Sequence, residues 1–138
     1  LGTVMGMDSP CNASTTIVLT VDEVAEIIEQ IGSSYLEAYA DTQVLSIRGE
    51  SLTDWFDRLG EKVRLVRFTD GNYNGYRIWG KGVLPAEKLA EEIYRTGFNG
   101  LISFQIPGER YCENPKDAQK QNHFRALSAW REVMDCQR

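Results

Sequence analysis

Four polar side chains lie at or just after the ends of short apolar runs. Their chemical types limit the ligands and reactions that a site formed by them could support. They are Asp8, Asp41, Arg67 and Gln105. In proteins built from alternating strands and helices, the C-terminal ends of the strands meet at one edge and carry the functional groups. Two carboxylates at such an edge could hold a divalent cation. Arg67 offers only hydrogen-bond donors, and Gln105 offers a neutral carbonyl oxygen, so neither replaces a charged or imidazole ligand well.

The same four residues also have a structural interpretation. Polar groups at strand ends commonly cap helices and accept hydrogen bonds from loop amides, and that explanation suffices for any one of them alone. Their recurrence as a set, with Asp70 just beyond Arg67, favours a functional edge. Neighbouring carboxylates repel each other unless a cation lies between them. We therefore expect the Arg67 guanidinium within hydrogen-bonding reach of Asp8 or Asp41.

Strand and helix signals alternate along the chain and predict the elements that position these residues. Apolar β-branched and aromatic runs predict strands at 3–7, 35–40, 63–68 and 101–106. Capping and glycine signals predict helices at 21–31, 51–59, 85–96 and 115–133. Strands separated by helices pair in parallel through right-handed crossovers. A closed barrel of eight such units needs about 250 residues. A single α/β domain over 1–138, either half of a barrel or a small open sheet, is therefore expected.

Composition and charge exclude two classes of partner. The net charge is −5 and no basic block is present, which argues against nucleic acid. No apolar run approaches the roughly 20 residues of a membrane span, and the N-terminal residues lack the features of a signal peptide. The three cysteines, Cys11, Cys112 and Cys136, are too widely spaced for a zinc site and odd in number. We expect reduced thiols and a cytoplasmic location.

Several segments in order resemble one family. The segment 49–62, GESLTDWFDRLGEK, resembles a helix of the sugar phosphate isomerase/epimerase family. Members of this family are TIM barrels of the xylose isomerase type. The strand that leads to Asp70-Gly71, the loop 79–82 with the following Leu84-Pro85, and the segment 96–100 fit the same family in the same order. The resemblance is nearest to the fructoselysine and tagatose 3-epimerase branch. It runs from residue 1 to about 127 and covers the C-terminal half of such a barrel, strands 5 to 8.

This resemblance implies a metal site, and the chain departs from it. The family holds a divalent metal, often manganese, with Glu, Asp, His and Glu at the ends of strands 5 to 8. The first and last Glu also move a proton beside the sugar carbonyl. Those positions fall on Asp8, Asp41, Arg67 and Gln105. Asp41 and Asp8 are thus the remaining metal ligands, and Asp8 and Gln105 occupy degenerate catalytic positions. No metal is expected at high occupancy.

The resemblance also suggests which residues touch a sugar or sugar phosphate. These are Arg67, Tyr76, Arg77, Trp79 and Lys81. The family activity is isomerisation or epimerisation by enolisation beside a carbonyl. Because the proton-transfer carboxylate of strand 8 is missing, activity of this chain alone is expected to be weak or absent. The alternative is a non-catalytic relative that binds carbohydrate or completes a barrel. A redox or nucleotide-binding domain is disfavoured, because neither a CxxC pair nor a glycine-rich phosphate loop follows a strand.

A half-barrel alone would leave sheet edges and the interior face of its strands without cover. We therefore expect the chain to pair with a second copy or with a missing N-terminal half. Four strand residues are predicted to become more deeply buried in that assembly: Val66, Phe68, Ile102 and Phe104.

Overall fold

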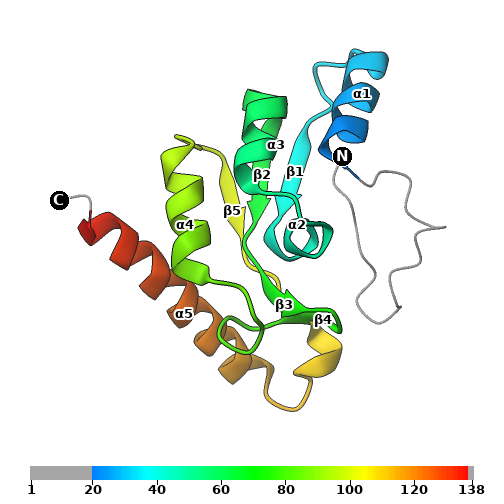
Figure 1. Cartoon of the computed structure of the whole chain (residues 1–138). Helices are drawn as coiled ribbons and strands as arrows, with labels where there is room; N and C mark the ends of the chain where they lie inside the picture. Colours follow the sequence, from blue (N-terminus) through cyan, green and yellow to red (C-terminus); the bar gives the residue numbers. More distant parts are fainter. Residues whose placement is uncertain (1–19, 137–138) are drawn as a thin grey trace.

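The computed structural model describes residues 20–136, which form a mixed α/β unit (Figure 1). Its helices are α1 (Val21–Ile31), α2 (Thr42–Arg48), α3 (Leu52–Leu59), α4 (Ala86–Arg95) and α5 (Pro115–Cys136). Its strands are β1 (Ala38–Asp41), β2 (Val63–Arg67), β3 (Asp70–Asn72), β4 (Gly75–Arg77) and β5 (Leu101–Ser103). Short 3₁₀ turns occur at Gly60–Lys62 and Gly108–Arg110. The expected alternation of strands and helices is confirmed over this part of the chain.

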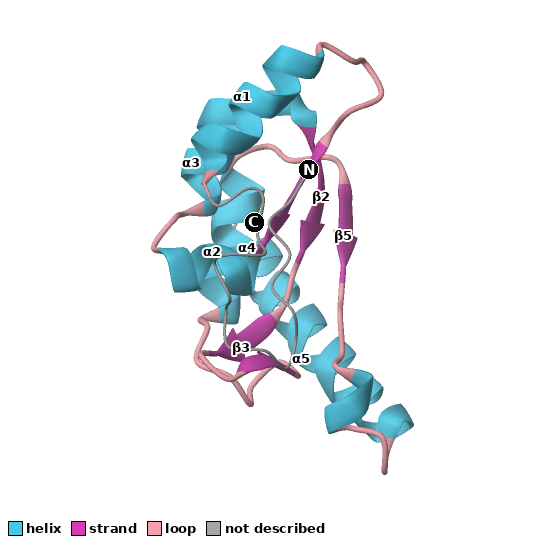
Figure 2. Ribbon diagram, turned by 90° about the vertical axis from the view of Figure 1, so that its right-hand side faces the viewer, coloured by secondary structure: helices cyan, strands magenta, loops and turns pink. Residues whose placement is uncertain are grey.

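Three of the predicted strands form one parallel sheet. Its strand order is β1-β2-β5, and both pairings are parallel. The predicted strand at 3–7 lies outside the described residues. Because the three strands run in the same direction, their C-terminal ends reach the same edge, next to the β3-β4 hairpin (Figure 2). That edge is where the sequence placed the candidate site.

Helices α1, α3 and α4 lie together on one side of the sheet (Figure 2), and α5 packs against α4. The core between them is apolar and includes Trp55, Val66, Phe68 and Ile93. Val66 and Phe68 are 0% exposed within this chain. The expectation that these two side chains need a partner for burial is therefore wrong: they point into the helix layer. Phe68 packs its ring against Trp79, with centroids 4.4 Å apart.

Local capping explains why two of the helices begin where they do. Thr20 and Glu23 form a reciprocal capping box at the start of α1, as the sequence predicts, and Ser51 and Asp54 form another at α3. Glu50 connects the two helices: its carboxylate accepts from the Val21 amide and from the Trp55 indole, each at 3.0 Å.

Two elements depart from the sequence expectation. Residues expected as loop after the second predicted strand, 35–40, fold into α2, which starts directly at the end of β1 and is capped at its C-terminus by Gly49 with φ of 73°. The glycine-rich segment after β2 forms the antiparallel β3-β4 hairpin. Over the part of the chain that the structure covers, no helix is long and apolar enough to cross a membrane.

Candidate functional site

Asp41 ends β1 and caps α2, so its carboxylate lies at the C-terminal edge of the sheet. Its Oδ1 accepts hydrogen bonds from the backbone amides of Gln43 at 3.0 Å and Val44 at 3.2 Å. This is the geometry of an N-cap, in which a side-chain oxygen satisfies amides of the first helical turn. Asp41 is 3% exposed. A carboxylate this deeply buried needs further partners, because an unpaired buried charge is costly.

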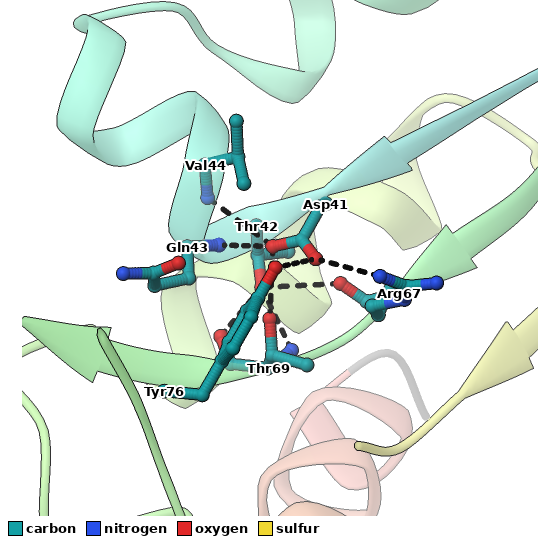
Figure 3. Close-up of polar contacts among 7 residues, drawn as sticks. All are labelled: Asp41, Thr42, Gln43, Val44, Arg67, Thr69 and Tyr76. Atoms are coloured by element: carbon teal, nitrogen blue, oxygen red, sulfur yellow. Dashed lines mark hydrogen bonds and ion pairs between the residues drawn. The ribbon is translucent and has the colours of Figure 1, made fainter. Parts of the chain in front are cut away.

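Those partners come from β2, β4 and the segment between β2 and β3 (Figure 3). The Thr69 hydroxyl donates to Oδ1 at 3.0 Å, and the Tyr76 hydroxyl donates to Oδ2 at 2.8 Å. The guanidinium of Arg67 lies 3.7 Å from Oδ2, an ion pair. Arg67 therefore pairs with Asp41 by charge, but the expected hydrogen-bonding reach is not met for this carboxylate. We call Asp41, Arg67, Thr69 and Tyr76 the Asp41 cluster.

Thr42 fixes the position of Thr69 within this cluster. The Thr42 hydroxyl donates to the Thr69 carbonyl at 2.6 Å and accepts from the Thr69 amide at 2.8 Å. Both threonines are buried. Sequence reasoning missed them, although each adjoins a predicted site aspartate in the pairs Asp41-Thr42 and Thr69-Asp70.

Burial controls the protonation of the cluster. It raises the pKa of Asp41, and the hydrogen bonds from Tyr76, Val44 and Thr69 and the charge of Arg67 oppose this effect only in part. Burial, followed by the charge of Asp41, raises the pKa of Tyr76. The Tyr76 hydroxyl therefore keeps its proton and acts as a donor. Burial also raises the pKa of Tyr39, whose ring lies 4.8 Å beneath the Arg67 guanidinium.

A second buried carboxylate organises the loop that follows β4. Asp70 accepts from the amides of Gly71 and Leu84 on Oδ1 and from those of Gly80 and Gly82 on Oδ2. These four donors occupy both oxygens. Gly82 approaches so closely that a Cβ atom at this position would overlap the Asp70 carboxylate. Asp70 thus holds the loop that carries Lys81 against the end of the sheet.

The remaining predicted site residues lie in different environments. Trp79 is 3% exposed, and its indole donates to the Phe68 carbonyl, so it supports the site from the core. Arg77 donates to the carbonyl of Tyr76, whereas Lys81 is exposed. Gln105 is half-buried just beyond β5. Asp8 lies outside the described residues. Direct contact with a sugar stays a prediction for Trp79, Arg77 and Lys81, as do the degenerate catalytic positions for Asp8 and Gln105.

The described residues fit a divalent metal poorly. Both oxygens of Asp41 already accept hydrogen bonds, and the permanent cation of Arg67 lies where a metal would need to approach Oδ2. Among residues 20–136, no group of three or more His, Cys, Asp or Glu side chains converges on one point. Any metal site would need ligands from elsewhere and a rearranged Asp41.

Comparisons with known proteins agree with this architecture. No family model matches the chain. The chain is 25% identical over 117 residues to fructoselysine 3-epimerase of Escherichia coli O157:H7, covering 82% of this chain and 42% of that protein. The protein of the same name from Shigella flexneri matches to the same extent. The structure of an L-ribulose 3-epimerase superposes with a TM-score of 0.60 at 13% identity, covering 87% of this chain and 46% of the other.

These matches bear on the fold and the family resemblance. The chain spans less than half the length of the curated relatives it matches. Its parallel sheet, with helices gathered on one side, corresponds to part of the epimerase structure. The chain is therefore similar, in sequence and in fold, to about half of a sugar epimerase of the TIM-barrel type.

Proposed function

We propose that the chain is a sugar-binding half-barrel that takes a sugar or sugar phosphate at the C-terminal edge of its sheet and lacks the metal-dependent epimerisation that the family resemblance implies. One observation carries this proposal: hydrogen bonds from the protein itself occupy both carboxylate oxygens of Asp41. The sugar is inferred from the names of the matched epimerases. We retain the cytoplasmic location predicted from the cysteines.

Enolisation beside a carbonyl needs a base that can take a proton from carbon. Asp41 is a poor candidate, because it faces Thr69, Tyr76 and Arg67 rather than open space. Gln105 has no basic oxygen. The groups that remain at this edge are donors, above all Arg67, whose side chain is 24% exposed, and Lys81. Donors of this kind bind sugar hydroxyls or a phosphate without supplying the proton transfer.

The test compares metal binding with turnover. The 138-residue chain is titrated with manganese by calorimetry and assayed for epimerisation of a ketose. We expect no tight metal binding and little or no turnover, because the Asp41 oxygens are engaged. Arg67→His with Gln105→Glu restores two ligand types and is expected to tighten manganese binding by at least about tenfold. Tight binding or rapid epimerisation by the unmodified chain would refute the proposal.

A second function, completion of a barrel with a partner, has its own observation. Among the described strands, β5 is an edge strand, and its Leu101 is 74% exposed. Phe104 and, on α5, Phe124 are also exposed large apolar side chains. An uncovered edge with exposed apolar residues is a ready site for pairing with another strand.

We expect the chain to self-associate or to bind a separate N-terminal half through this edge. Light scattering on the full chain at micromolar concentration measures the first case. Leu101→Lys, which places a charge on the edge, is expected to shift the chain toward monomer, whereas Val83→Lys at another exposed apolar residue serves as the control. This function would be excluded if the chain stays monomeric and does not bind a separate N-terminal half.

A further inference from the structure

A pocket of about 750 Å³ lies between the segment that follows β5 and the first half of α5. Phe104 and Ile106 form its apolar wall, and Lys116, Lys120 and Asn122 of α5 contribute polar groups. None of these three helix residues was singled out by the sequence. The pocket is distinct from the Asp41 cluster, since none of that cluster's residues lines it.

Asn122 gives the pocket a buried donor with a fixed orientation. The residue is 2% exposed, and its Oδ1 accepts from the Trp79 backbone amide at 2.7 Å. A backbone N–H can only donate, so this contact assigns the oxygen and leaves the NH₂ group on the other side. Asn122 lines the pocket, and its oxygen is taken by the Trp79 amide. The NH₂ group is therefore a donor that can serve a ligand in the pocket.

The other polar groups favour a negatively charged ligand. Lys116 and Lys120 lie one helical turn apart and both line the pocket. The Tyr111 hydroxyl accepts from the Ile78 amide at 3.2 Å, which leaves its proton free to be donated to a ligand. The first turn of α5 adds the positive end of a helix dipole. Among the described lining residues there is no carboxylate; Asp117, in the same turn, is not one of them.

We infer that this pocket binds the phosphate group of a sugar phosphate. The phosphate is indicated by the pocket's own donors and cations, whereas the sugar rests on the proposed function. One short segment connects the two places: Tyr76 donates to Asp41, Ile78 donates to the pocket residue Tyr111, and Trp79 donates to Asn122. A sugar phosphate held by its phosphate thus lies beside the segment that reaches the Asp41 cluster.

The experiment follows amide resonances of the labelled full chain during titration with fructose 6-phosphate, fructose or inorganic phosphate. The side-chain NH₂ of Asn122 is the direct reporter. We expect fructose 6-phosphate to shift it saturably, inorganic phosphate to shift it with lower affinity, and fructose to leave it unchanged. Lys116→Met with Lys120→Met is expected to weaken binding by about tenfold or more, because charge-assisted hydrogen bonds are lost.

Matched variants distinguish binding in this pocket from a nonspecific attraction of the anion to positive charges on the protein. Lys88→Met removes one positive charge from an exposed position on α4. It is expected to leave the affinity for fructose 6-phosphate unchanged. Asn122→Asp keeps an oxygen for the Trp79 amide but replaces the donor with a negative charge, so it should abolish phosphate binding. The proposal is overturned if fructose shifts the same resonances as strongly, if Asn122 does not respond, or if Lys88→Met weakens binding equally. Manganese-dependent epimerisation would refute only the proposed function, because it leaves these shifts unaffected.

Discussion

Replacing Asp41 with Ala is expected to lower the free energy of unfolding by about 3–5 kcal/mol. The substitution removes the cap of α2, which alone is worth about 1 kcal/mol. It also leaves the buried hydroxyls of Thr69 and Tyr76 without their acceptor and Arg67 without its counter-charge. Urea unfolding followed by circular dichroism measures the change. Asp57→Ala, at an exposed aspartate of α3, is the control and should shift stability by no more than about 0.5 kcal/mol.

The stability of Asp41→Asn, compared with that of the unmodified chain at different pH values, tests whether the pKa of Asp41 is raised. Burial raises the pKa of Asp41 above its value in the unfolded chain, so the folded state binds the proton more tightly. The stability from this group is then fully present below the unfolded pKa and is lost as pH rises through the folded pKa. Asn does not titrate. The loss in free energy of unfolding caused by Asp41→Asn should therefore be larger at about pH 4 than at about pH 7. A deficit that grows with pH would contradict the raised pKa.

The elements with strong local signals were predictable from sequence. The capping box of Thr20 and Glu23 marks the start of α1 to the residue, because both hydrogen bonds join residues three apart. The β-branched and aromatic run at 63–68 likewise predicts β2, in which Val63 and Val66 are buried. Signals of this kind depend on neighbours in the chain, so the sequence contains all that is needed to interpret them.

The role of Asp41 could not be decided in this way. A carboxylate just after a strand looks the same in sequence whether it caps a helix or binds a metal. The partners that distinguish these roles, Thr69 and Tyr76, lie 28 and 35 residues further along the chain. The side of the sheet to which Phe68 points was also misjudged, because a half-barrel has apolar residues on both faces. Asn122 gave no signal at all, since its helix is polar at that position.

Gly82→Ala is the second substitution with a large expected effect, about 3 kcal/mol or more. A Cβ at this position would overlap the carboxylate of Asp70 and approach the amide of Gly71. Either the carboxylate moves and loses its hydrogen bonds to the Gly80 and Leu84 amides, or the loop moves away from the sheet. Gly108→Ala is the matched control, because among the described residues no heavy atom beyond its two chain neighbours lies within 4 Å of its Cβ position.

A double-mutant cycle decides whether the Asp70 carboxylate is the cause. If the clash with that side chain dominates, Gly82→Ala should cost much less in an Asp70→Ala background, and the two changes should be strongly non-additive. Urea unfolding gives the four stabilities, and hydrogen exchange of the Gly80 and Leu84 amides reports whether the loop has detached. Additive costs would show that the backbone around Gly71, rather than the carboxylate, excludes a side chain at position 82, and that Asp70 does not determine the path of this loop.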